Sequence, residues 1–122
     1  MSTDVEYREV FKKRTKQFAL RAIKLYQALP KSGEAKVIGN QFLRSATSVA
    51  ANYRAACRAR SGKEFYSKLS IVVEEADETL FWLELLSESE IFTQEKLNSI
   101  TIEATEILKI VAKARKNTIV KD

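Results

Sequence analysis

Residues 44–65 read RSATSVAANYRAACRARSGKEF, a stretch rich in alanine and serine that carries four arginines. A flexible linker, a basic nucleic-acid-binding arm and a packed helix can all have this composition, so the spacing of its residues must distinguish them. Two rows of mostly apolar or small residues run through it at intervals of three and four. The first row is Ile38, Phe42, Ser45, Val49, Asn52, Ala56 and Ala59, and the second is Leu43, Ala46, Ala50, Tyr53 and Cys57. This order predicts a helix over about 34–60 with a wide face of small side chains.

The turn after this helix is marked by Ser61 and Glu64, which have the spacing of a capping box. In that motif the serine oxygen accepts from a free N–H of the first turn, and the glutamate reaches back to the start of the helix. Apolar residues then recur at helical spacing from Phe65 to Leu83. They predict another helix over about 62–87.

Two further helices are predicted on either side of this pair. Apolar residues between Phe11 and Leu29 follow a heptad seam, which predicts a helix over about 7–29 that Pro30 ends. A second seam continues from Leu97 to Ala114. It predicts a helix over about 93–116 with Thr93 as its N-cap.

The composition supports a helical domain. The chain has 122 residues with only three glycines and one proline, which is too few turn residues for a many-stranded β fold. We therefore expect one all-α domain over residues 1–122, an antiparallel up-down-up-down four-helix bundle. The charged N-terminus has no apolar signal segment, and no apolar run approaches the roughly 18 residues of a membrane span. These features favour a cytoplasmic protein.

The residues that most enzyme sites need are missing from the sequence. There is no histidine, which excludes the usual zinc sites and a Ser-His or Cys-His nucleophile, and there is no phosphate-binding glycine motif. The single cysteine, Cys57, lies on the small-residue row and is expected to pack as a small hydrophobe. We expect no enzyme activity, no cofactor and no metal.

Charge is distributed very unevenly along the chain. Residues 10–63 hold thirteen Lys or Arg and one acid, whereas residues 70–106 hold ten Asp or Glu and one base. One explanation is mutual attraction between helices, within or between subunits. The other is a basic surface for RNA or another polyanion. The candidate phosphate-binding residues are Lys12, Lys13, Lys16, Arg54, Arg58, Arg60 and Lys63.

Considered alone, the residues favour the first explanation, because the sequence has no RNP motif and no GxxG loop of the KH type. The four tyrosines are expected in the core or at an interface and not on a base-stacking platform. They are Tyr7, Tyr26, Tyr53 and Tyr66.

The second row on the helix over 34–60 exceeds what the interior of one bundle needs. We therefore expect it to be covered by another copy of the chain in a homo-oligomer. The expected oligomer face is Leu43, Ala46, Ala50, Tyr53 and Cys57.

Polar residues also interrupt the apolar pattern. Because the second and third helices are expected to form a hairpin, residues at equal distances from Ser61-Gly62 should lie at similar heights. This predicts a partly buried hydrogen-bonded cluster in which Asn52 reaches Glu75 and Arg44 neutralises Glu78. Its members are Arg44, Ser45, Ser48, Asn52, Glu75 and Glu78. The alternative is that the two glutamates face solvent.

The runs QFLRSATSVAANYRAA and KEFYSKLSIVVEEADETLFWLELL resemble the bacterial four-helix-bundle proteins encoded in intervening sequences of 23S rRNA genes, the S23 ribosomal protein family. The first run matches the family at Arg44, Ser45, Ala46, Ser48, Val49 and Asn52. The second matches it at Phe65, Leu69, Val72, Glu78 and, one place displaced, Leu80. The chain departs from the family after Asn52, where Tyr53-Arg54-Ala55-Ala56 lacks the family's acidic residue and glycine.

The resemblance implies a four-helix bundle that assembles into a barrel-like homopentamer, as in the more distantly similar accessory proteins of diversity-generating retroelements. It also implies a genetic link to ribosomal RNA, with RNA or a ribonucleoprotein as the expected partner. It supplies no catalytic residue. The alternative function is a protein-interaction module whose charge polarity serves only subunit assembly.

Overall fold

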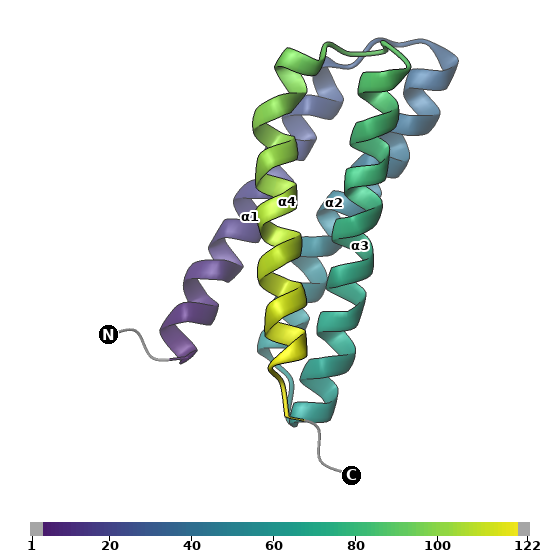
Figure 1. The fold of residues 1–122 in the computed structure, drawn as a ribbon. Coiled ribbons are helices and arrows are strands. Elements are labelled where there is room, and N and C mark those ends of the chain that lie inside the picture. Colours follow the sequence, from purple (N-terminus) through teal and green to yellow (C-terminus); the bar gives the residue numbers. More distant parts are fainter. Residues whose placement is uncertain (1–3, 120–122) are drawn as a thin grey trace.

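The computed structural model describes residues 4–119, which form four helices and no strand. The helices are α1 (Asp4–Ala28), α2 (Gly33–Cys57), α3 (Gly62–Glu88) and α4 (Gln94–Lys116), and each runs antiparallel to the one before it (Figure 1). The all-α four-helix bundle expected from the apolar spacing is therefore confirmed.

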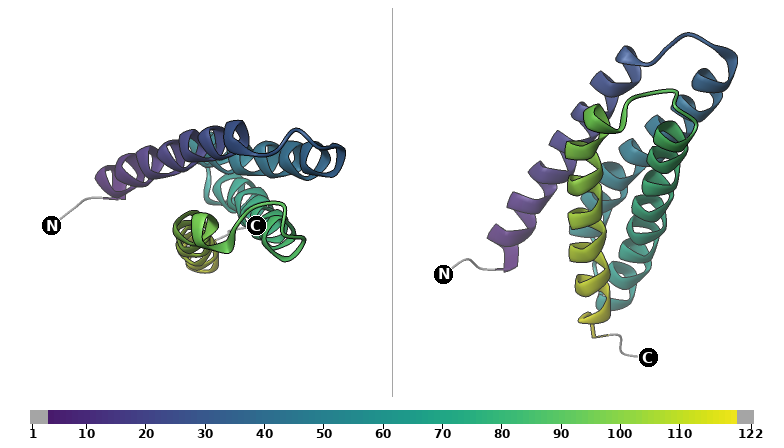
Figure 2. Two further views of the ribbon diagram at one scale, coloured as in Figure 1. Left: turned by 90° about the horizontal axis from the view of Figure 1, so that it is seen from above. Right: turned by 45° about the horizontal axis from the view of Figure 1, so that its top comes forward.

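The helices lie in two layers, with α1 and α2 in one and α3 and α4 in the other (Figure 2). Helix α2 packs against both α1 and α3, whereas α1 and α4 touch much less because the N-terminal half of α1 diverges from the bundle. Two polar links cross this narrow α1–α4 contact. Arg14 donates twice to the carboxylate of Glu103 at 2.8 Å, and Arg21 donates to the hydroxyl of Ser99 at 2.8 Å.

The core is built from the apolar seams of all four helices. Phe18, Phe42, Leu83 and Ile107, one from each helix, are at most 2% exposed. Burying a side chain of this size stabilises the fold by roughly 1.5–3 kcal/mol. The first seam also contains a fully buried polar residue, Thr15, whose hydroxyl donates to the carbonyl of Lys12 at 3.0 Å. This hydrogen bond offsets the cost of burying the hydroxyl.

The helix boundaries follow local signals in some places and not in others. Ser61 caps α3 as expected, since its side chain accepts from the N–H of Glu64 at 3.0 Å, and the Glu64 carboxylate reaches back to the N–H of Arg60 at 3.5 Å. Thr93 occupies the N-cap position of α4, but its side chain makes no capping hydrogen bond. Helix α2 ends at Cys57, three residues before the expected limit.

The turn after α3 contains a residue in the left-handed region, Glu90, with a φ of 62°. The chain reverses there, and the N–H of Phe92 donates to the carbonyl of Leu86 at 3.1 Å. Glycine usually occupies such a position because it has no Cβ to clash. Glu90 therefore adopts a backbone conformation that is unfavourable for a residue with a side chain.

In the part of the chain from residue 4 to 119, no helix has the length and apolar character needed to span a membrane.

Candidate nucleic-acid interface

A groove of about 380 Å³ lies between α1 and α2, and five cations line it. They are Lys12, Lys13, Lys16, Arg54 and Arg58. We call this feature the basic groove. It brings together five of the seven residues that we predicted from the sequence to be phosphate ligands.

Helix periodicity explains how the basic groove forms. Lys12 and Lys16 are four residues apart on α1, and Arg54 and Arg58 are four apart across the end of α2, so each pair lies on one side of its helix. Ala50 and Ala51 also line the groove. Their small side chains leave the space between the two cationic walls unfilled.

Four of the five cations in the basic groove are not paired with a carboxylate of the described residues. Lys12 forms an ion pair at 2.8 Å with Glu9, which also lines the groove. The hydrogen bond from Lys12 lowers the pKa of Glu9 below its ordinary value. Within residues 4–119, the other four cations have no carboxylate within ion-pair distance. Arg14 and Arg44 differ from them, because each is paired with an acid of another helix.

The other two proposed phosphate ligands lie outside the basic groove. Arg60 is in the α2–α3 loop and lines a second hollow. Lys63 is exposed in the first turn of α3 and lines neither hollow.

The second hollow, which we call the end pocket, has a volume of about 630 Å³. It opens where the N-terminal part of α1 diverges from the C-terminal end of α4, and the α2–α3 loop also lines it. Its lining includes Tyr7, Arg8, Arg60, Phe65 and Asn117, and none of its lining residues is acidic. The guanidinium of Arg8 lies 4.2 Å from the centroid of the Phe65 ring.

The structure places the tyrosines, which the sequence analysis considered together, in different environments. Tyr53 is 3% exposed and packs edge-on against Phe11 with ring centroids 4.8 Å apart, so it is a core residue as expected. Tyr7 is 53% exposed and lines the end pocket. Of the two expected locations, core or interface, Tyr7 does not occupy the core of the single chain, because the divergence of α1 takes its first turns away from α4.

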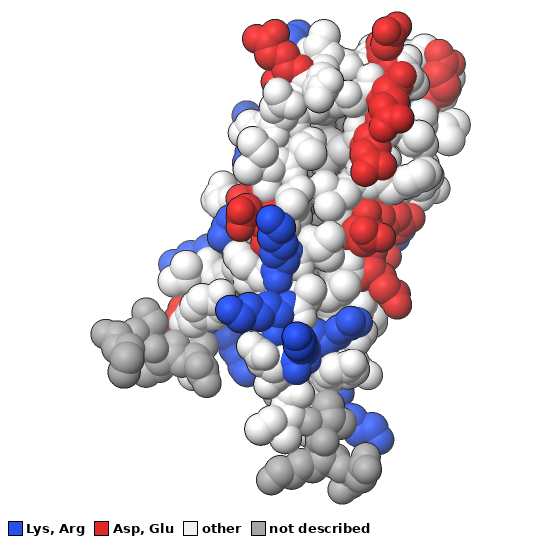
Figure 3. All heavy atoms as spheres, in the orientation of Figure 1, with Lys and Arg blue, Asp and Glu red and all other residues white. Residues whose placement is uncertain are grey.

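The end pocket belongs to a broadly basic end of the molecule. Figure 3 shows Lys and Arg gathered toward the end of the bundle where α4 finishes, with Asp and Glu toward the other end and along α3. The antiparallel topology brings Lys113, Arg115 and Lys116, in the last turn of α4, to the same end as the start of α3. Sequence reasoning missed this contribution, although the basic run at the end of the last predicted helix was a signal for it.

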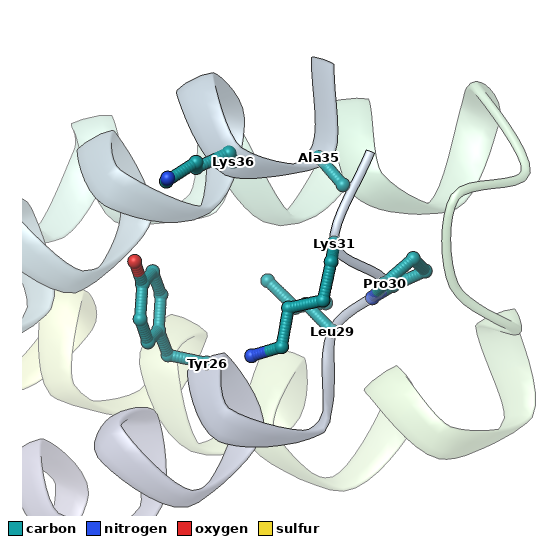
Figure 4. A pocket seen from close by; sticks show the side chains of 6 residues that line it. All are labelled: Tyr26, Leu29, Pro30, Lys31, Ala35 and Lys36. Atoms are coloured by element: carbon teal, nitrogen blue, oxygen red, sulfur yellow. The ribbon is translucent and has the colours of Figure 1, made fainter. Parts of the chain in front are cut away.

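A third, smaller hollow of about 190 Å³ lies at the opposite end of the bundle, between the end of α1 and the start of α2 (Figure 4). Lys31 and Lys36 line it beside Tyr26, whose hydroxyl donates to Asn40 at 2.6 Å. This hollow has two cations beside mainly apolar walls, so it attracts a polyanion much less strongly than the basic groove does.

The proposed oligomer face is largely used inside the single chain. Ala46 is completely buried and Tyr53 nearly so, while Leu43 and Cys57 are half-buried against the core and Ala50 lines the basic groove. Helices α1 and α3 both cover α2. The second row therefore does not by itself require another subunit. Burial also raises the pKa of the Cys57 thiol, which disfavours the reactive thiolate.

The polar residues of α2 and α3 form two separate groups. Arg44 donates to Glu75 at 3.0 Å and to Glu78, so both glutamates are paired across the hairpin. Asn52 instead donates to the hydroxyl and carbonyl oxygens of Ser48 in its own helix, at 2.9 and 3.0 Å. No hydrogen bond joins Asn52 to Glu75 in the described residues. The expected contact is wrong because the Asn52 amide finds acceptors one turn away.

Ser45 has a different partner from the one that the hairpin register suggested. Its hydroxyl oxygen lies 2.9 Å from that of Thr79, one residue beyond Glu78, and both residues are fully buried. Glu78 is turned toward Arg44 at the surface of the bundle. The register was therefore right to within one residue, but it did not identify the buried partner.

No group of three His, Cys, Asp or Glu side chains within residues 4–119 has a geometry that could hold a metal ion.

The fold and its two basic hollows define a helical bundle with a surface suited to polyanions. The chain belongs to the 23S rRNA-intervening sequence protein family, whose profile matches residues 9–113. It is similar to a protein of unknown function from the S23 ribosomal protein family of Bacteroides thetaiotaomicron VPI-5482, known from a crystal structure. The two are 40% identical, the match covers 90% of this chain and 98% of the other, and the TM-score is 0.83. No curated protein sequence matches the chain.

Proposed function

We propose that this protein is a non-enzymatic, oligomeric helical bundle that binds RNA, free or within a ribonucleoprotein, in the cytoplasm. The observation that carries the proposal is the basic groove, where four cations without carboxylate partners surround a floor that includes two alanines. Such a surface attracts the regularly spaced phosphates of a nucleic acid and contains nothing that reads sequence. Membership of a family named for an rRNA intervening sequence agrees with this partner.

The spacing of the cations suits an extended backbone. Arg54 and Arg58 are separated by about 6 Å along the chain direction of α2, as are Lys12 and Lys16 along α1. Two such rows can contact successive phosphates of one strand from both sides. Each phosphate contact releases condensed counterions, so binding must weaken as salt increases.

The test is fluorescence anisotropy with a labelled 20-nucleotide RNA over a range of salt concentrations. Five phosphate contacts to a single strand give a slope of about −3.5 in a plot of log K against log salt. The double variant Arg54→Glu and Arg58→Glu should lose most of the affinity for every RNA sequence tried. Lys24→Glu with Lys31→Glu is the matched control, because it lowers the net charge of +5 equally outside the groove.

The second candidate is a protein-interaction module in which charge serves only assembly of identical subunits, with five copies as the family resemblance suggests. The exposed acids Glu74, Asp77 and Glu84 on α3 favour it, because none has an ion-pair partner among the described residues and they complement the basic groove. In that case the groove variant should dissociate the oligomer in light scattering, and the wild-type protein should retain no RNA at physiological salt.

A further inference from the structure

The end pocket differs from the basic groove in its aromatic character. Tyr7 stands half-exposed in its wall, and Phe65 is half-buried beneath the guanidinium of Arg8. Arg8 and Arg60 bring positive charge, and no acid lines the pocket. Its volume of about 630 Å³ lies within the range of small-molecule sites, roughly 300–1,000 Å³. A planar ligand that carries a negative charge fits this combination.

The end pocket and the basic groove are neighbours along two segments of the chain. Arg8 precedes Lys12 of the groove by four residues, which is about 6 Å along α1. Arg60 of the pocket follows Arg58 of the groove by two residues in the α2–α3 loop. A polyanion that extends past Lys12 and Arg58 at this end of the basic groove therefore reaches the end pocket next.

We propose that the end pocket takes one unpaired nucleobase of the RNA whose phosphates lie in the basic groove, so that the protein selects single-stranded RNA over duplex. This inference rests on the proposed function and adds the substrate class. The base stacks on Tyr7, Arg8 and Arg60 hold the adjoining phosphate, and the amide of Asn117 hydrogen-bonds to the base edge. Aromatic side chains stack on unpaired bases, whereas the bases of a continuous duplex are already stacked on one another.

Anisotropy titrations should compare a labelled 20-nucleotide oligouridylate with a blunt 20-base-pair RNA duplex at the same salt concentration. The wild-type protein should bind the oligouridylate about tenfold more tightly, in line with the stacking of one base. Tyr7→Ala should remove most of this preference and leave the salt slope unchanged, because no phosphate contact is lost. Tyr66→Ala is the matched control, since Tyr66 is 38% exposed on α3 and lines neither hollow.

Photocrosslinking supplies a direct readout of the position of the base. An oligouridylate with one 5-iodouracil should crosslink on irradiation to the peptide that contains Tyr7 or Phe65. Equal binding of strand and duplex that Tyr7→Ala leaves unchanged, or crosslinks only to peptides remote from the pocket, overturns the base pocket and leaves RNA binding in the groove intact. Failure to bind either RNA overturns the proposed function itself.

Discussion

Ser45 on α2 and Thr79 on α3 place their hydroxyl oxygens 2.9 Å apart in the interior of the bundle. Each hydroxyl also lies near a carbonyl of its own helix, that of Phe42 for Ser45 at 3.1 Å and that of Glu75 for Thr79 at 2.7 Å. These three hydrogen-bonding contacts share two hydroxyl protons, and both residues are buried away from water. The pair joins α2 to α3 at one height and so favours this register over a slip by one turn.

Removing either hydroxyl should lower the free energy of unfolding by about 1 kcal/mol, because the remaining one keeps only its carbonyl partner. The double variant Ser45→Ala with Thr79→Val should lose about 0.5–1 kcal/mol less than the two single changes together. Urea denaturation measures all three. Ser45→Ala with Thr105→Val is the control, because Thr105 donates to Thr101 within α4 and should be additive. Additivity in the Ser45–Thr79 cycle would show that the pair is uncoupled.

Local signals in the sequence predicted the features that depend on a few adjacent residues. The start of α3 is one example, because Ser61 and Glu64 specify the cap by themselves. The end of α2 is a counterexample, since the row of small residues continues through Ala59 and no glycine or proline marks the stop at Cys57. Helical spacing was uninformative there because the loop residues happen to continue it.

The candidate interface was predictable to the extent that helix spacing fixes it. Lys12 and Arg54 face one groove because each helix presents them on the side next to the shared α1–α2 contact. The end pocket was not predictable, because it depends on the divergence of α1 from α4. That divergence is a property of the whole packing arrangement, and no pattern around Tyr7 reports it.

The Arg14–Glu103 pair should make part of the stability depend on pH. The hydrogen bond from Arg14 lowers the pKa of Glu103 below its ordinary value of 4.5. The contribution is therefore complete above pH 4.5 and is lost as the pH falls through the lower, folded-state pKa. Arg14→Gln should cost up to about 1 kcal/mol at neutral pH, because both side chains are partly exposed.

The diagnostic result for this pair is the pH profile. The stability difference between wild type and Arg14→Gln should shrink as the pH is lowered below the ordinary pKa of Glu103. Arg21→Gln is the control, because Arg21 donates across the same α1–α4 contact to the uncharged Ser99. If the two variants give parallel profiles, the Arg14 pair makes no ionic contribution.

Glu90→Gly should stabilise the protein by about 0.5–1 kcal/mol, because it relieves the cost of a side chain in the left-handed region. Glu90→Ala keeps a Cβ at the same φ of 62° while removing the same charge. Thermal denaturation of both variants separates backbone strain from charge. An equal gain in the two would assign the effect to the charge at the end of α3.

Gly33 and Gly62 offer a matched comparison, because each begins a helix directly after a serine N-cap. A Cβ on Gly33 would meet nothing within 4 Å, whereas one on Gly62 would lie 2.5 Å from the carbonyl oxygen of Ile119. Gly33→Ala should therefore be neutral or stabilise by about 0.5 kcal/mol through the unfolded state. Gly62→Ala should be less stable than Gly33→Ala in urea, since the backbone after α4 must move. Equal stabilities of the two variants would mean that the contact between Ile119 and the start of α3 contributes nothing to the stability of the fold.

Glu9 is the acid that opposes RNA in the basic groove, since it holds the ammonium of Lys12 at 2.8 Å. A phosphate that approaches Lys12 must displace this carboxylate and is also repelled by it. Glu9→Gln removes both effects, so the affinity for the 20-nucleotide RNA should rise about threefold, a modest change because the ion pair is exposed to solvent. Glu34→Gln changes the net charge equally, and Glu34 lies in the first turn of α2, outside the groove. It should therefore alter the affinity far less in the same anisotropy titration. Equal effects of Glu9→Gln and Glu34→Gln would mean that RNA responds to net charge alone and that the basic groove is not its site.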